Sequence, residues 1–259
     1  MKIREVIAAL ELVAPLPLQE GYDNAGLQVG LTEAEISGAL LCLDVTEAIV
    51  DEAIHEGCNL IVAHHPLIFR KLSHITGDSY VERAVMKAVK HDVAIVAAHT
   101  NLDNAEGGVN FKIAEKLKLS ELEPLQGPVV DGKWSGVVGM LPTALPAEDF
   151  VQLLKREFGV SCVRANELLH RPIRRVALCG GSGAFMLGDA LRVGADAFVT
   201  GEMGYHEFFG YEQQLQICVI GHYESEQFTT EIFRDVIARY CPGVRTVMAR
   251  TVTNPIVYL

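Results

Sequence analysis

The sequence lacks several patterns that identify broad classes of protein. Its 259 residues include one tryptophan, six cysteines without any CxxC pair, and 22 Lys and Arg against 33 Asp and Glu. No apolar run approaches the roughly 18–20 residues of a membrane-spanning helix. The scattered cysteines exclude a zinc ribbon and are typical of a reduced, cytoplasmic protein. The net charge of −11 argues against broad nucleic-acid binding by a basic surface.

A nucleotide-binding loop is also missing in its full form. Gly180-Gly-Ser-Gly183 follows an apolar strand, but it has neither the complete GxGxxG pattern nor the lysine of a P-loop. Such a turn is either an anion site at a helix N-terminus or a tight turn that needs glycine for its backbone. The apolar fraction of 49% and charged fraction of 21% indicate an ordinary folded domain rather than a disordered chain.

Short β-branched runs alternate with helical patterns, which predicts an α/β fold. The expected strands are Gly38–Leu43, Leu60–Ala63, Val93–Ala97, Trp134–Leu141, Arg174–Cys179, Ala197–Thr200 and Gln216–Ile220. The expected helices include Lys2–Val13, Tyr80–Lys90, Asn110–Leu117, Tyr205–Gln214 and Tyr223–Tyr240. The Pro- and Gly-containing stretch Leu119–Gly132 predicts a boundary between lobes 1–127 and 128–259. The last helix and strand belong to the second lobe or pack back on the first.

Four of these strands end near a histidine, and three of the four add a carboxylate. The residues concerned are His64 and His65, then His99 with Asp103, then Glu202 with His206, and finally His222 with Glu226. Ligands of open α/β sheets bind at the carboxyl ends of strands. Polar side chains at the ends of buried strands are costly without partners. The repetition therefore predicts a metal site.

His222 and Glu226 are four residues apart at a predicted helix start and share one helix face. The alternative is an ordinary surface pair at that spacing. For Asp103, an Asx turn with Asn104 is as good an interpretation as a metal ligand. Together with His64 and His65, these residues make three imidazoles and two carboxylates. One catalytic ion uses about three protein ligands, so five suit two ions of Zn, Mn, Fe or Co.

The remaining strand-end residues are candidates for supporting roles. His99 and His206 are the predicted catalytic residues, which would transfer protons or orient ligands, although neutral packing is an equal alternative. Glu202 is more readily interpreted as a surface residue. Tyr205 and Tyr223 are candidates for stacking on a substrate ring, against ordinary packing at helix starts.

Six ordered motifs resemble those of the type 2 GTP cyclohydrolase I homologue family, also called Nif-three-like dinuclear metal proteins. They are Asp23–Gly30, Ala63–Pro66, His99–Asp103, Gly180–Gly183, Thr200–His206 and Gly221–Glu226. The resemblance implies two similar three-layer α/β lobes with mixed sheets and a dinuclear metal centre in the cleft between them. By motif matching, the family's ligands fall on His64, His65, Asp103, His222 and Glu226.

The resemblance further implies a homohexamer and, because Leu119–Pro128 is short, a member without the inserted middle domain. Glu202 stands where the family more often has aspartate. The function expected is a metal-dependent hydrolase with two divalent ions, acting on a nucleotide or phosphate ester. A metal-binding oligomeric scaffold or regulator without turnover is the alternative. Neither a membrane nor bulk nucleic acid is expected as a partner.

Overall fold

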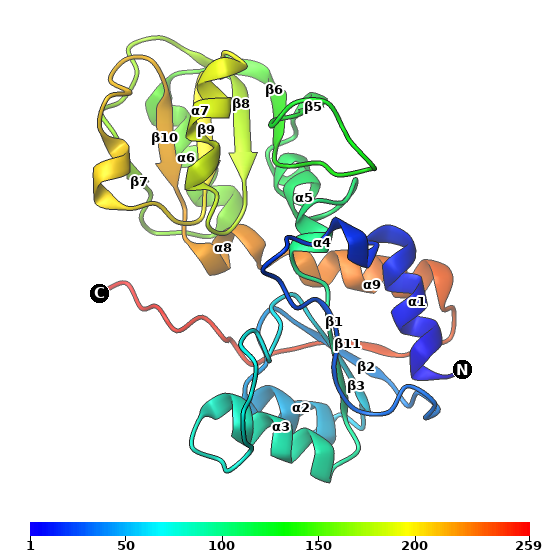
Figure 1. The fold of residues 1–259 in the computed structure, drawn as a ribbon. Helices are drawn as coiled ribbons and strands as arrows, with labels where there is room; N and C mark the ends of the chain where they lie inside the picture. Colours follow the sequence, from blue (N-terminus) through cyan, green and yellow to red (C-terminus); the bar gives the residue numbers. More distant parts are fainter. The chain divides into compact units, whose positions relative to one another are not determined.

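The computed structural model describes all 259 residues, and they form two compact units. The first comprises Met1–Ala105 and Thr229–Val257, and the second comprises Glu106–Phe228 and Tyr258–Leu259. This division differs from the one that the sequence suggests after residue 127. Helix α5 (Val109–Lys116) lies in the second unit because it packs on strands of that unit's sheet, and helix α9 (Thr229–Tyr240) lies in the first (Figure 1).

The sheet of the first unit has five strands in the order β1-β4-β3-β2-β11. The four strands from β4 to β11 are parallel to their neighbours, and β1 pairs antiparallel with β4. The strands are β1 Gly26–Val29, β2 Ala39–Cys42, β3 Leu60–Ala63, β4 Ala94–Ala97 and β11 Thr246–Met248. Because β2, β3 and β4 are aligned through Cys42, Ala63 and Ala97, the residues after them emerge at one edge of the sheet.

Helices pack on this sheet through the apolar side chains that its strands present to them. Leu40, Ile61 and Ile95 belong to a core cluster with residues of α2 (Glu47–His55) and α3 (Tyr80–Lys90). Helix α1 (Ile3–Val13) packs on α9, and α9 in turn packs on β2. The Thr46 and Ser79 side chains cap α2 and α3 by accepting hydrogen bonds from backbone N–H groups. The short helices are η1 Leu16–Leu18 and α4 Thr100–Asp103.

The sheet of the second unit has six strands in the order β5-β6-β8-β9-β10-β7, with β8, β9 and β10 parallel and the outer pairings antiparallel. Its strands are β5 Ser120–Pro124, β6 Val137–Leu145, β7 Arg164–Ala165, β8 Ile173–Cys179, β9 Ala197–Thr200 and β10 Gln216–Val219. Its other helices are α6 Ala147–Phe158, η2 Ala184–Met186, α7 Leu187–Arg192, η3 Tyr205–Phe208 and α8 His222–Glu226. The prediction of two α/β units with mixed sheets is confirmed.

Two predicted helices differ from the structure. The span Tyr205–Gln214 contains only the 3₁₀ turn η3, because Phe209 is extended and Gly210 has φ +88°. The span Tyr223–Tyr240 is divided into α8 and α9, and the break lies where the chain passes from the second unit to the first. Helical periodicity alone shows neither interruption.

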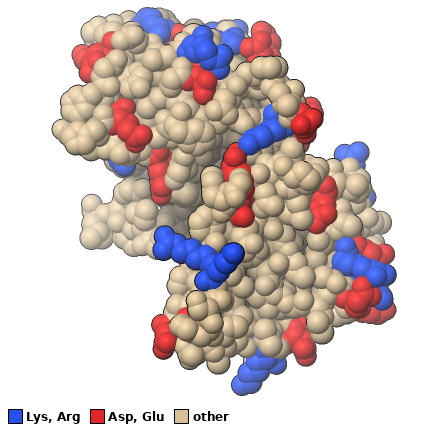
Figure 2. Space-filling view, in the orientation of Figure 1, with Lys and Arg blue, Asp and Glu red and all other residues tan.

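On the face shown in Figure 2, acidic and basic side chains are interspersed and no continuous basic patch is visible. None of the helices combines the length and the apolar character that a bilayer crossing requires.

Candidate metal centre

Three imidazoles of the first unit follow the ends of two adjacent parallel strands. His64 and His65 come directly after β3, and His99 lies two residues after β4. The backbone N–H of His65 donates to Leu43 O at 2.9 Å, which fixes the turn after β3 to the chain leaving β2. The side chain of His64 has no solvent exposure, whereas those of His65 and His99 are 22% and 17% exposed.

Each of these imidazoles donates a hydrogen bond from Nδ1 to an acceptor that is not one of the other two rings. The partners are Ala98 O for His64 at 2.8 Å, Asp44 Oδ1 for His65 at 2.7 Å and Asp23 Oδ1 for His99 at 2.7 Å. A carbonyl or carboxylate only accepts, so we assign the proton to Nδ1 in all three rings. Nε2 is then the basic nitrogen of each ring, which is how metal-ligating histidines are oriented by their surroundings.

The three rings converge. Their centroids lie 4.9–5.4 Å apart, and ligand atoms of His64, His65 and His99 all lie within 4.8 Å of one another. Asp103, at the end of α4, places Oδ1 3.6 Å from His64 Nε2. A mixed set of imidazole and carboxylate donors without thiolate suits Zn, Mn, Fe or Co. The first unit therefore has the chemistry of a metal-binding group.

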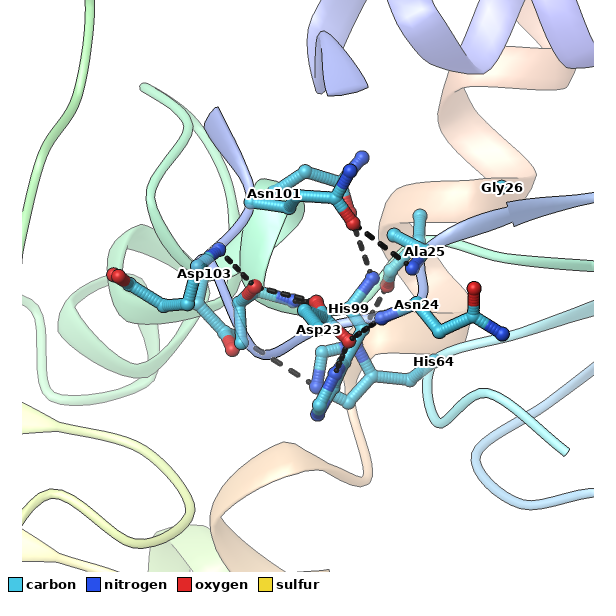
Figure 3. A network of polar contacts seen from close by, with 12 residues as sticks. Asp23, Asn24, Ala25, Gly26, His64, His99, Asn101 and Asp103 are labelled. Atoms are coloured by element: carbon cyan, nitrogen blue, oxygen red, sulfur yellow. Dashed lines mark hydrogen bonds and ion pairs between the residues drawn. The ribbon is translucent and has the colours of Figure 1, made fainter. Parts of the chain in front are cut away.

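Asp23 holds this cluster from the loop before β1, and sequence reasoning did not select it as a site residue. Its carboxylate accepts from His99 Nδ1, from the backbone N–H of Thr100 at 3.0 Å and from the Thr100 hydroxyl (Figure 3). Burial raises the pKa of this carboxyl, but the hydrogen bonds from His99 and Thr100 outweigh burial and lower the pKa to about 2. Asp23 is thus an ionised anchor for His99.

Asp44 plays the same part for His65. It follows the end of β2, and it accepts from His65 on one oxygen and from the Thr253 hydroxyl, at 2.7 Å, on the other. Burial raises its pKa, and the two hydrogen bonds together with the charge of His65 lower it below the usual value. The rule that polar residues at strand ends form sites would have found Asp44, since it ends a predicted strand as His64 does.

In the second unit, His222 lies between two glutamates at the start of α8. Its Nε2 is 3.1 Å from Glu226 Oε2 and its Nδ1 is 3.1 Å from Glu202 Oε1. The Ser182 hydroxyl donates to Glu202 Oε2 at 2.6 Å. Two donor atoms about 3 Å apart can share one ion at bond lengths of about 2.1 Å. Glu202 is 52% exposed, as the interpretation of a surface residue predicts, and it also contacts His222 on the side opposite Glu226.

The glycine turn after β8 makes room for these side chains. Gly181 has φ +56°, and a Cβ there would overlap Oε1 of Glu226 and lie 3.5 Å from His222 Cε1. The N–H groups of Gly180, Gly181 and Gly183 donate to Asn110, Ser225 and Thr200. Because these three donors are used within the protein, the turn is better explained by close approach than by anion binding.

His206 lies on η3 in an exposed aromatic cluster. Its ring contacts Tyr205 at 5.1 Å and stacks on Phe209 at 6.3 Å between centroids. A pocket of about 340 Å³ opens beside this cluster, lined by Arg164, Ala165, Tyr205, Phe208 and Phe209. Arg164 donates to Met203 O at 2.6 Å and lies 5.4 Å from the Phe208 ring centroid. The pocket therefore combines aromatic faces with the guanidinium of Arg164, which is hydrogen-bonded to the residue that follows Glu202.

A third group of convergent donors, His74, Asp78 and Glu82, lies in the first unit. Glu82 Oε2 accepts from the backbone N–H groups of Thr76, Gly77 and Asp78 at 2.9–3.2 Å. The hydrogen bond from Thr76 is the largest cause that lowers its pKa to about 2. Glu82 thus serves the loop before α3, which explains the group without an ion.

Comparison with known proteins extends over nearly the whole chain. A protein-family model described as Duf34/NIF3 (NGG1p interacting factor 3) matches residues 1–255. A Clostridium perfringens protein named GTP cyclohydrolase 1 type 2 homolog is 38% identical over 228 residues, with 87% of each chain covered. A Lactococcus lactis protein of the same name is 33% identical, with 98% of each chain covered. The resemblance inferred from the six motifs is confirmed.

Among solved structures, a Bacillus cereus protein related to NIF3 superposes with a TM-score of 0.91 at 25% identity, covering 100% of this chain and 99% of that one.

Proposed function

The chain belongs to the Duf34/NIF3 family, and on that premise we propose that it is a metal-dependent hydrolase of a small nucleotide-like or phosphate-ester substrate. The observation that carries the proposal is the common orientation of the imidazoles. His64 and His65 each donate from Nδ1 to an acceptor, so Nε2 is the basic nitrogen that could bind a metal ion. His99 is oriented in the same way, although it is not among the proposed ligands. Surface histidines have no need of such anchors, whereas metal ligands do.

Two divalent ions are proposed, held by five residues of the two units: His64, His65, Asp103, His222 and Glu226. The donor chemistry within each unit supports this assignment, since imidazole nitrogen and carboxylate oxygen lie 3.6 Å apart at His64 and Asp103 and 3.1 Å apart at His222 and Glu226. Bound ions of this kind supply Lewis acidity and lower the pKa of coordinated water from 15.7 to about 7.

The chain's own residues supply the proton chemistry. We assign proton transfer to His99, because Asp23 holds its Nδ1–H and thereby makes Nε2 the nitrogen that can accept a proton. Asp23 acts as the positioning residue. A catalytic role of His206 stays a prediction, and its ring contacts with Tyr205 and Phe209 support a part in substrate binding.

Two observations support a nucleotide-like substrate. Curated relatives carry the name GTP cyclohydrolase 1 type 2 homolog, and the pocket beside η3 offers aromatic rings together with Arg164. Aromatic faces stack on bases, and a guanidinium attracts the charge of a phosphate. Tyr205 is 72% exposed and Phe209 is 59% exposed, so both rings are accessible to a ligand. Tyr205→Ala is expected to raise KM with little change in kcat.

Metal analysis of the purified protein tests the metal site. His222→Ala is expected to retain less metal than the parent while showing the same circular dichroism spectrum. His170→Ala is the matched control, because that imidazole is 79% exposed and lies in a loop of the same unit. Unchanged loading of His222→Ala would remove His222 from the site, and no metal in the parent would reject the proposal as a whole.

A panel of nucleotides, cyclic nucleotides and phosphodiesters tests the reaction, with Mn, Zn and Fe loaded separately. Formate release from GTP that disappears in Glu226→Gln would support a cyclohydrolase. Release of phosphate or a nucleoside monophosphate would indicate a phosphoesterase. Inactivity of the metal-loaded protein throughout the panel would reject turnover of these substrates.

That last result would favour the second candidate function, a metal-binding scaffold. The apolar C-terminal residues support it, since Ile256 is 51% exposed and Val257 is 75% exposed. Exposed apolar residues at a chain end suit a subunit interface. The homohexamer remains a prediction, which light scattering after size-exclusion chromatography tests directly.

A further inference from the structure

The C-terminal segment reaches the surroundings of His65 through the hydroxyl of Thr253. Thr253 donates from Oγ1 to Asp44 Oδ2 at 2.7 Å, and His65 donates from Nδ1 to Asp44 Oδ1 at 2.7 Å. Both oxygens of Asp44 are therefore engaged, one by the segment and one by the imidazole. A carboxylate held on both oxygens has less rotational freedom than one held by a single partner.

The fold explains why Thr253 arrives there. Strand β11 runs parallel to β2, with Met248 opposite Leu41, so the two chains leave the sheet at the same edge. The N–H of Ala249 continues this pairing by donating to Leu41 O at 2.9 Å. Asp44 follows β2 and Thr253 follows β11. Parallel pairing thus brings together residues that are 209 positions apart in the chain.

Glu52 on α2 fixes the path between β11 and Thr253. Its two oxygens accept from the backbone N–H groups of Arg250 at 2.7 Å and Thr251 at 3.0 Å. This clamp sets the direction of the chain two residues before Thr253. The segment is therefore held independently of Asp44, and the Thr253 hydroxyl can act as a fixed donor rather than a mobile one.

We propose that Thr253 is a positioning residue of the metal site, acting through Asp44 to hold the His65 imidazole with Nε2 toward the ligand group. The inference rests on the proposed metal-binding function and adds to it a part of the chain that contains no ligand. Loss of an outer hydrogen-bond partner lowers metal affinity by about 10–100-fold in comparable sites. Thr253 is separated from the His65 ring by two hydrogen bonds, whereas Asp44 is separated from it by one. We therefore expect its loss to lower metal affinity by about tenfold, the lower end of that range.

The test compares three variants of the full chain. Thr253→Val removes the hydroxyl at nearly constant volume, and Thr253→Ser keeps it. Thr251→Val is the matched control, because it makes the same substitution two residues away, on a side chain that contacts Glu52 rather than Asp44. Zinc and cobalt affinities are measured by competition with a chromophoric chelator, and the melting temperature of each metal-free variant is recorded.

We expect about tenfold weaker binding for Thr253→Val, parental affinity for Thr253→Ser, and a clearly smaller loss for Thr251→Val, because the backbone N–H of residue 251 still donates to Glu52. In ¹⁵N-edited spectra of the metal-free protein, the Nδ1–H resonance of His65 should weaken or shift in Thr253→Val alone. Parental affinity and an unchanged resonance in Thr253→Val would overturn the positioning role while leaving the metal site intact. Equal losses in both valine variants would also overturn it, since a general loosening of the segment would then explain them. A parent protein that binds neither metal would reject the proposed function itself.

Discussion

The two units hold their candidate metal-binding side chains by different means. In the first, the three imidazoles follow buried parallel strands and are anchored from behind by hydrogen bonds of 2.7–2.8 Å to Ala98, Asp44 and Asp23. In the second, His222 lies on the five-residue helix α8 with a glutamate 3.1 Å from each ring nitrogen. The first group is positioned by polar partners, whereas the second combines a polar partner, Glu202, with close approach of the backbone at Gly181 and Gly201.

This difference decides what each group tolerates. A side chain held by a hydrogen bond loses its orientation when the acceptor is removed, even if the substitution preserves volume. A side chain that packs closely against backbone is displaced when a single methyl group is added there, even if every hydrogen-bond partner remains. Gly201 shows the second case again, because a Cβ there would lie 2.9 Å from His222 Cα and 2.8 Å from Ser225 Oγ. The comparison therefore predicts opposite kinds of sensitive mutation in the two units.

The largest effect is expected from Gly181→Ala in the second unit. The new Cβ would overlap a carboxylate oxygen of Glu226 and force that side chain away from His222. We expect metal affinity of this pair to fall by about 100-fold, as for loss of a ligand's support. Isothermal titration with Zn²⁺ or Co²⁺ measures the loss.

Gly159→Ala is the control for backbone strain. Gly159 also has a left-handed backbone, with φ +67°, but no atom lies within 4 Å of the position of its Cβ. Both substitutions carry about 1–2 kcal/mol of conformational strain. Equal metal affinity in the two variants would contradict the close-contact explanation and attribute the effect to strain alone.

The corresponding change in the first unit is Asp23→Asn. Asparagine keeps one acceptor but presents an NH₂ group where His99 or Thr100 must donate. Hydrogen bonds to charged groups contribute about 1.5–3 kcal/mol, so we expect metal-free protein at pH 7 to lose about 2 kcal/mol of unfolding free energy. Urea denaturation measures it. Asp51→Asn, which removes an exposed ion pair with Lys87, should cost less than about 1 kcal/mol.

The stability that Asp23 provides has a defined pH dependence. Its folded pKa of about 2 lies below the usual aspartate value of 3.8, so the ionised carboxylate stabilises the folded state fully above the unfolded pKa. As pH falls from about 4 toward 2, that contribution is lost. The part of the stability difference between parent and Asp23→Asn that comes from the carboxylate should therefore shrink as the pH falls from about 4 toward 2. A difference that grows on acidification would contradict the assignment.

The sequence predicts the strand-end histidines because their positions follow a local rule. His64, His65 and His99 each follow an apolar run, and parallel pairing of those runs brings them to one edge. Asp44 obeys the same rule. Asp23 does not, because it lies in a polar loop and its partner His99 is 76 residues away. No local pattern distinguishes such an aspartate from a solvated one.

The glycines of the second unit also lie beyond what a local pattern shows. Gly180–Gly183 indicates a turn, but its contact with Glu226 depends on how α8 packs after β10. The predicted helix Tyr205–Gln214 fails for a related reason. Its apolar residues suit a helix face, and in the structure Phe208 and Phe209 line a pocket instead. Periodicity shows which residues are apolar and leaves open what they pack against.

The smallest effect is expected at the third donor group, His74, Asp78 and Glu82. A mutation there tests whether the Glu82 carboxylate has a structural role or could bind a metal ion. Glu82→Gln turns an amide toward N–H groups of Thr76 and Gly77 that need acceptors. We expect the melting temperature to fall by about 3 °C, through loosening of the loop before α3, with metal content unchanged. Glu115→Gln, an exposed residue paired with Lys112, serves as the control and should melt as the parent does. Loss of metal from Glu82→Gln would instead make His74, Asp78 and Glu82 a second metal-binding group of the first unit.

The distinction rests on where the hydrogen bonds come from. Backbone N–H groups saturate Glu82 Oε2, whereas the anchors of His64, His65 and His99 engage only the far side of each ring and leave Nε2 directed toward its neighbours.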